Sequence, residues 1–148
     1  MVRDCVAVYT GRDSAVQRRY LAQYPGQQYF KIGGMTPAQV LQGFRRSYVY
    51  VDFGSASGRD RVPREAALQG CCVFLHAEGA NALHADHAIP PYYRFTSRDV
   101  ATGVLQEKIL AVQADPKGHY VSQYDYHRQI IHEPVVFEEQ VRRLFFED

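Results

Sequence analysis

The sequence predicts an α/β fold with a mainly parallel sheet, helices on both faces of that sheet and further helices at the carboxyl terminus. Short runs rich in β-branched and aromatic residues alternate along the chain with amphipathic stretches of helical length. Such alternation is typical of parallel sheets built from β-α-β units. A chain of 148 residues is the size of one domain and can bury a core without disulfides. We therefore expect a single Rossmann-like domain over residues 1–148.

Composition argues against several classes of protein. The 17 basic and 16 acidic side chains leave a net charge of +1, so no overall charge favours nucleic acid or an acidic membrane surface. No apolar run reaches the roughly 20 residues of a transmembrane helix, and the first residues lack the features of a signal peptide. We expect a cytoplasmic protein with no transmembrane segment and no nucleic-acid partner.

The three cysteines are a poor basis for a disulfide framework. Cys71 and Cys72 are adjacent, and successive side chains of a strand point to opposite faces of the sheet. Both are expected to be small buried residues of a strand that is covered on both sides.

The amino-terminal third contains two strand–helix pairs. Residues 5–10 and 28–32 are predicted strands. Asp13 or Ser14 can cap the first helix, which ends at Pro25-Gly26. The second helix has a clearer start, because Thr36 stands at the cap position, Pro37 follows it, and Gln39 completes a capping box.

The centre of the chain predicts a strand, a loop, a helix and a second strand. Residues 48–53 and 71–75 are predicted strands, and apart from Asp52 they are apolar, as expected of strands buried on both faces. Residues 54–62 form a loop rich in glycine and arginine. Pro63 is expected to open the short helix between the loop and the second strand.

The carboxyl-terminal half predicts mostly helices. Residues 76–91 read as a long irregular loop over the site, followed by a short strand at 92–95. Helices are predicted over about 98–114, capped by Thr96 or Ser97, and then over 122–132 and 134–146. The segment 115–118 is expected to break the chain between the first two of these helices.

A single site is predicted where the strands end. Right-handed crossovers bring the loops after Thr10, Ile32, Phe53 and Leu75 to one rim of the sheet. In open α/β sheets, ligands bind outside the carboxyl ends of the strands, where helix amino termini attract anions. The loop after Phe53 adds glycine freedom and cationic forks suited to phosphate. Its candidate ligand-binding residues, with those of the following helix, are Ser55, Gly58, Arg59, Arg61 and Arg64.

Several residues near this rim have two interpretations. Glu65, in the first turn of the predicted helix, either interacts with the helix dipole or accepts hydrogen bonds from both hydroxyls of a ribose. Asp60 is a helix cap or an ion-pair partner that orients an arginine. Lys31 is a solvated lysine before a turn, or a charge beside a base-binding loop at Gly33. Gly11-Arg12 is a candidate for ligand binding only because it is predicted to lie on the same rim.

The histidines raise the question of a metal. His84 and His87 flank Asp86, and His76 lies upstream, but the segment is neither a clear helix nor a cysteine knuckle. We therefore expect no metal and no resident cofactor, with these histidines on the surface or in a loop that folds over a ligand. His119, His127 and His132 read as structural.

One stretch resembles a known family. The run YVDFGSASGRDRVPREAALQGCCVF, preceded by IGGMTPAQVLQGFRRS, is similar to the donor-binding, carboxyl-terminal half of GT-B-type glycosyltransferases, in particular to a bacterial group with YIDFG, PGKDR, PREA and GCCV blocks. The resemblance implies a nucleotide sugar or nucleoside diphosphate as ligand. It also implies that Glu65 binds the ribose, that Gly33 borders the base and that Gly11 and Arg12 reach the diphosphate.

Two departures from that family bear on activity. Many GT-B enzymes have a second glutamate eight residues before the ribose glutamate, and that position is Ser57 here. The acceptor domain that faces the donor half in these enzymes does not precede the predicted first strand. We expect it to come from a partner subunit or from a longer parent chain, and the exposed face could otherwise pair in a homodimer. The catalytic residues are unknown, and the isolated chain is expected to be inactive.

Three functions are therefore considered. The first is a donor-nucleotide-binding module of a glycosyltransferase, in which arginines and a helix amino terminus would stabilise the leaving diphosphate without a metal. The second is a stand-alone, non-catalytic nucleotide-binding protein, such as a sensor or scavenger of a nucleotide signal. The third is an interaction domain with a vestigial site.

Overall fold

A five-stranded sheet forms the centre of the computed structural model, which describes residues 2–11, 14–54, 61–77, 88–132 and 134–146. The strand order is β2-β1-β3-β4-β5, and every neighbouring pair is parallel. This confirms the predicted α/β fold. The strands are β1 Cys5–Tyr9, β2 Tyr29–Ile32, β3 Ser47–Asp52, β4 Cys72–His76 and β5 Arg94–Phe95.

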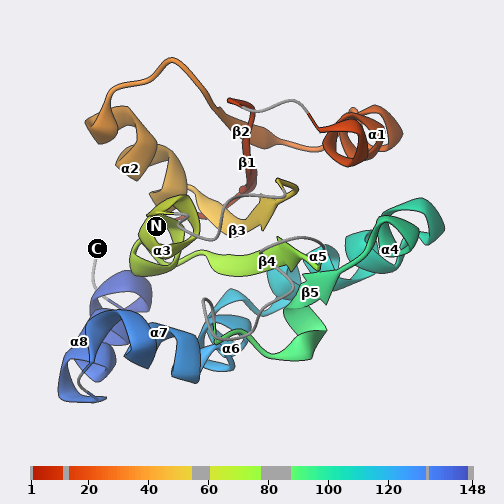
Figure 1. Ribbon diagram of the computed structural model, residues 1–148. Helices are drawn as coiled ribbons and strands as arrows, with labels where there is room; N and C mark the ends of the chain where they lie inside the picture. The colour runs from red at the N-terminus through yellow and green to blue at the C-terminus, as the bar shows by residue number, and fades with distance from the viewer. Residues whose placement is uncertain (1, 12–13, 55–60, 78–87, 133, 147–148) are drawn as a thin grey trace.

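Helices lie on both faces of the sheet. In Figure 1, α2 and α3 lie together on one side of the strands, and α1 and α4 lie on the other. α5 packs against β3, while α7 packs against both α3 and α8. The helices are α1 Ala15–Gln23, α2 Pro37–Arg45, α3 Arg61–Leu68, α4 Ser97–Thr102, α5 Val104–Ala114, α6 Pro116–Val121, α7 Tyr124–Ile131 and α8 Pro134–Phe145, with a 3-10 turn, η2, at Pro91–Tyr93.

The core follows from the position of β3 and β4 inside the sheet. Every residue of both strands is buried, because each strand has a neighbour on either side and helices over its faces. Their sequences are apolar except at the strand ends, which is the pattern expected of such strands. Cys71 and Cys72 are fully buried free thiols, as predicted.

Local capping signals place the first two helices. The Ser14 side chain accepts a hydrogen bond from the Gln17 N–H at the start of α1. Thr36 and Gln39 form the predicted reciprocal capping box at the start of α2, with Pro37 in its first turn. These caps satisfy backbone N–H groups that have no partner within the helix.

Four predictions for the elements are corrected. The single helix expected over 98–114 is two helices, because Gly103 has a left-handed backbone (φ 86°) that ends α4 and precedes α5. The break expected over 115–118 is present at Asp115, where α5 ends, but Pro116–Val121 then form a short helix, α6, that was not expected. The strand expected from Tyr92 is the turn η2 followed by a two-residue strand. Finally, α3 begins at Arg61, two residues before Pro63.

The outer edge of β4 is covered by a side chain as well as by a strand. β5 pairs only with Leu75 and His76. At Val73 the buried Gln123 side chain takes the place of a strand: its Nε2 donates to the Val73 carbonyl at 2.8 Å and its Oε1 accepts from the Val73 N–H at 3.1 Å. Gln123 thereby satisfies backbone groups that would otherwise be unpaired at a sheet edge.

The amino edge of the sheet is held together by Arg3. Its guanidinium donates to the carbonyls of Phe44 and Ser47, each at 3.0 Å, and to that of Gln69 at 2.8 Å. It also lies 5.4 Å from the centre of the Phe145 ring. One side chain therefore joins the ends of α2 and α3, the start of β3 and helix α8. Within the described ranges, the helices are too short or too polar to cross a membrane.

Candidate functional site

The candidate site lies at the carboxyl edge of the sheet, between β1 and β3. The chain passes from β1 to β2 on one side and then returns to β3 on the other, so the order reverses between these two strands. Ligands of doubly wound sheets with this strand order bind at such a switch point. The Ser14 hydroxyl, at the start of α1, donates to the carbonyl of Phe53 at 3.4 Å. The segments after β1 and β3 are therefore in contact, as their predicted convergence requires.

The end of β1 is fastened to the end of β2. The Thr10 N–H and Thr10 hydroxyl both donate to the carbonyl of Ile32, at 2.9 and 3.0 Å. A Cβ on Gly33 would stand 2.9 Å from the Thr10 oxygen, and one on Gly11 would meet the Tyr9 ring. Both glycines are exposed at the rim, and the absence of a side chain lets the backbone approach its neighbours closely.

Of the two predicted cations at this part of the rim, the structure describes Lys31 but not Arg12. Lys31 is exposed, and its Nζ lies 5.9 Å from the centre of the Tyr29 ring. That arrangement agrees with a solvated lysine whose stem covers an aromatic residue, and its role beside a base stays a prediction. Arg12 lies outside the described residues.

The end of β3 contains a buried carboxylate that the sequence analysis did not single out. Asp52 is 6% exposed. Its Oδ1 accepts from the Gly54 N–H at 2.9 Å, and its Oδ2 accepts from the Tyr50 hydroxyl at 3.2 Å. These bonds turn the chain out of the sheet towards the arginine-bearing loop. An acidic residue at the end of an otherwise apolar strand was the available signal, because charged groups are seldom buried without partners.

Helix α3 carries the predicted arginines and the glutamate. Pro63, Ala66 and Ala67 are its buried residues, whereas Arg61 is exposed and Arg64 and Glu65 are half-buried. Because α3 begins at Arg61, Glu65 lies in the second turn rather than the first, about 6 Å along the axis from Arg61. This position makes a role for Glu65 in stabilising the helix dipole less favourable, because the interaction of a charge with the dipole fades beyond the first turn.

Positions 61 and 65 lie on neighbouring turns of one helix face, so Arg61 and Glu65 share a side of α3. Glu65 is neither in the core nor fully exposed. Three further predicted site residues, Ser55, Gly58 and Arg59, lie outside the described residues together with Asp60. The ligand-binding roles of the whole set stay predictions.

His76 was expected on the surface or in a loop, but it is the buried last residue of β4, next to the end of β5. His76 is 4% exposed and stacks on Phe95 with ring centres 5.2 Å apart. Its Nε2 lies 3.3 Å from the Ser97 hydroxyl at the start of α4. His84, Asp86 and His87 lie outside the described residues. Elsewhere in the chain, over the ranges that the structure describes, no three His, Cys, Asp or Glu side chains are grouped as a metal site requires.

Comparisons with protein families, with curated proteins and with solved structures found no match for this chain.

Proposed function

We propose that this chain binds a nucleoside diphosphate or nucleotide sugar at the carboxyl edge of its sheet, as the donor-binding domain of a GT-B-like glycosyltransferase. The observation that carries the proposal is the switch point between β1 and β3, where Ser14 meets the Phe53 carbonyl. The loop that starts there leads into α3, which bears Arg61, Arg64 and Glu65. The resemblance of residues 50–74 to the donor half of these enzymes supplies the ligand class.

The assignment gives each part of the rim a chemical task. The amino terminus of α1 and the arginines of α3 and its preceding loop would neutralise the diphosphate. Glu65 would accept hydrogen bonds from the ribose hydroxyls, which requires an ionised carboxylate near the start of α3. Glycosyl transfer would further require an acceptor half from another subunit or a longer parent chain, because a reacting sugar must be shielded from water.

The ribose assignment can be tested by calorimetry with paired ligands. UDP, GDP and ADP are titrated first, followed by the 2′,3′-dideoxy form of whichever binds. The wild-type chain should bind the dideoxy form about tenfold or more weakly, since a hydrogen bond to a charged group contributes roughly 1.5–3 kcal/mol. In Glu65→Gln the discrimination against the dideoxy form should be smaller than in wild type, because a neutral amide oxygen accepts a weaker hydrogen bond than a carboxylate does. Glu107→Gln, an exposed glutamate on α5, is the matched control and should behave as wild type.

Two results would reject this function. Absence of heat and of thermal stabilisation with all three nucleotides and their sugars would remove the ligand class, because a ligand at a hundred times its dissociation constant adds about 2.7 kcal/mol of stability. Equal discrimination against the dideoxy form in wild type and Glu65→Gln would leave nucleotide binding in place and remove Glu65 from the ribose.

A binding protein without transferase chemistry is the second candidate. It is favoured by Ser57, which stands where many GT-B enzymes have the glutamate that contacts the donor sugar. Under this alternative the purified chain should bind the nucleoside diphosphate as tightly as the nucleotide sugar. A preference of tenfold or more for the nucleotide sugar would favour the donor-binding domain instead.

A further inference from the structure

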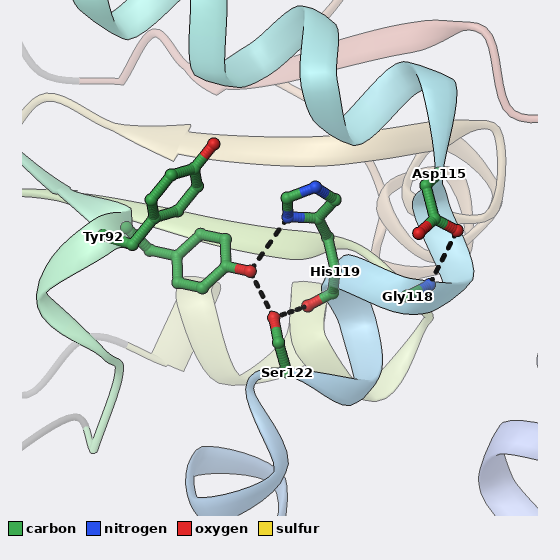
Figure 2. A pocket seen from close by; sticks show the side chains of 6 residues that line it. Tyr92, Asp115, Gly118, His119 and Ser122 are labelled. Atoms are coloured by element: carbon green, nitrogen blue, oxygen red, sulfur yellow. Dashed lines mark hydrogen bonds between the residues drawn. The ribbon is translucent and has the colours of Figure 1, made fainter.

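A pocket of about 340 Å³ lies outside the edge of β4, away from the carboxyl rim. Its lining comes from η2 and from the segment that contains α6. The Tyr93 ring packs edge-on against Phe74 of β4, with ring centres 5.3 Å apart, and so fixes the inner wall. The residues that line the pocket are Tyr92, Tyr93, Asp115, Gly118, His119 and Ser122 (Figure 2).

Three hydrogen bonds in the pocket wall form a closed chain. The Ser122 hydroxyl donates to the His119 carbonyl at 2.8 Å, so its oxygen is left to accept from the neighbouring Tyr93 hydroxyl. The Tyr93 proton is thereby used, and the Tyr93 oxygen must accept at its 2.9 Å contact with Nδ1 of His119. The neutral imidazole therefore carries its proton on Nδ1.

This tautomer leaves Nε2 of His119 as a lone-pair acceptor. Within the described ranges no hydrogen bond satisfies that atom. In Figure 2 the second ring nitrogen of His119 lies on the far side of the ring from Ser122. The directions of these hydrogen bonds thus determine that His119 presents a hydrogen-bond acceptor, Nε2, to a ligand.

The polar groups that remain available are mostly acceptors. The Gly118 N–H is already used, because it donates to Oδ1 of Asp115 at 3.1 Å. Asp115 is exposed, and its carboxylate still has room for further donors. Figure 2 shows Asp115 across the pocket from Tyr92, with His119 between them. A ligand between these groups must bring N–H donors and gains from a positive charge.

The aromatic wall favours the same kind of ligand. Tyr92 is 41% exposed and stacks on His119, with ring centres 5.9 Å apart. The protein's own Lys108 places its Nζ 4.6 Å from the centre of the Tyr92 ring. The same Nζ donates a hydrogen bond to the Tyr92 carbonyl at 2.9 Å, and a cation this close to a tyrosine ring is attracted by its π-system.

From these groups we propose that the pocket binds an organic cation with N–H donors, either a guanidinium or a primary ammonium. Nε2 of His119 and the Asp115 carboxylate accept its hydrogen bonds, and the Tyr92 ring packs against it. The ligand is the side chain of an arginine or lysine, or a free small molecule with the same group. This site is independent of the nucleotide proposed at the carboxyl edge.

The tautomer and the ligand can be tested together by NMR on the folded chain labelled with ¹⁵N-histidine. The His119 ring should show a protonated Nδ1 and an unprotonated Nε2. Methylguanidinium should then shift the Nε2 resonance saturably, whereas tetramethylammonium, a cation without N–H donors, should not. Blocked arginine amide and an arginine-bearing tripeptide compare the free and peptide sources, and saturable binding of either supports the proposal.

Three variants test whether methylguanidinium binding depends on the groups of this pocket or only on the overall charge of the protein. Asp115→Asn keeps a residue that can cap α6, and it should weaken methylguanidinium binding about tenfold or more through loss of a charged acceptor. Asp125→Asn, an exposed charge removal on α7, should leave the affinity unchanged. Tyr93→Phe breaks the chain of protons and should raise the population of the Nε2-protonated tautomer.

Three results would overturn the proposal. The first is a wild-type His119 with its proton on Nε2. The second is a response to tetramethylammonium equal to that seen with methylguanidinium. The third is an affinity for methylguanidinium that Asp115→Asn leaves unchanged while the variant remains folded by circular dichroism.

Discussion

The buried histidine of α7 should make the protein lose stability in mild acid. His127 is fully buried, and its ring packs against those of Tyr120 on α6 and Phe137 on α8, with centres 4.0 and 5.4 Å away. Across the described residues, neither ring nitrogen has a hydrogen-bond partner. Burial in this aromatic stack lowers the pKa of His127 from 6.5 to about 3, because the charged form has nothing to replace its hydration.

The sign of the effect follows from which state binds the proton. Between pH 6.5 and about 3 the unfolded chain protonates this histidine and the folded chain does not. Stability therefore falls as pH falls through that window. At pH 5, about 1.5 pH units below the unfolded value, the loss is about 2 kcal/mol, since each pKa unit corresponds to about 1.4 kcal/mol.

Urea unfolding followed by far-ultraviolet circular dichroism at pH 7, 6 and 5 measures this loss of folding stability. His127→Phe keeps an aromatic ring in the stack and removes the titration, so its stability relative to wild type should rise by about 2 kcal/mol between pH 7 and pH 5. Val141→Ala on α8 is the control for packing loss: it should lower stability by a similar amount at every pH. A wild-type-to-His127→Phe difference that stays constant from pH 7 to pH 5 would refute the assignment.

Two further predictions concern the amino-terminal part of β4 and the residues just before it. Gly70→Ala should destabilise the chain by roughly 2 kcal/mol or more in urea unfolding, because Gly70 has a left-handed backbone (φ 98°) and a Cβ would clash with the Arg3 guanidinium, which hydrogen bonds to three carbonyls hold in place. A loss below about 0.5 kcal/mol, the usual range of a neutral surface change, would contradict this prediction. Gln123→Leu should cost roughly 2–4 kcal/mol, since it leaves both backbone groups of Val73 without their partner. Hydrogen exchange at the Val73 amide should accelerate in this variant, and unchanged exchange there would show that another group covers the strand edge.

The parts of the fold predicted best are those specified by adjacent residues. Thr36 and Gln39 form their capping box as predicted, because a cap depends on groups within one turn. The buried strands β3 and β4 were also recognisable, since continuous apolar runs between turn signals have few alternatives. Both signals are local, and both survive in the three-dimensional structure.

The errors came from single residues whose effect depends on backbone conformation. Gly103 divides a stretch whose apolar spacing continues on both sides, so the helical period alone does not reveal the break. Pro63 was expected at the first helical position, but a proline is also tolerated elsewhere in a first turn, where its missing N–H has no intrahelical partner anyway. The start of α3 at Arg61 is therefore compatible with the sequence although it was not the expected one.

The polar residues in the interior had no sequence signal of their own. Gln123 pairs with a strand 50 residues away, and His127 is buried only because α6, α7 and α8 pack around it. Asp52 could have been noticed at the end of an apolar run, but its partners follow from the turn at Gly54. For the candidate site, the convergence of strand ends was predictable from topology. In the separate pocket beside β4, the tautomer of His119 depends on contacts that only coordinates give.

The two edges of the sheet differ in how their polar groups are satisfied, and this difference bears on the proposed function. At the amino edge Arg3 joins three carbonyls from separate elements, and burial lowers the pKa of its guanidinium. At the carboxyl edge the fixed groups, Asp52 and Thr10, bond mainly to their own turn or to the adjacent strand. The amino edge thus holds separate elements together, whereas the proposed nucleotide site lies at the carboxyl edge. Substitutions at Arg3 should therefore lower stability with little change in nucleotide affinity per folded molecule, and substitutions at Glu65 should do the reverse.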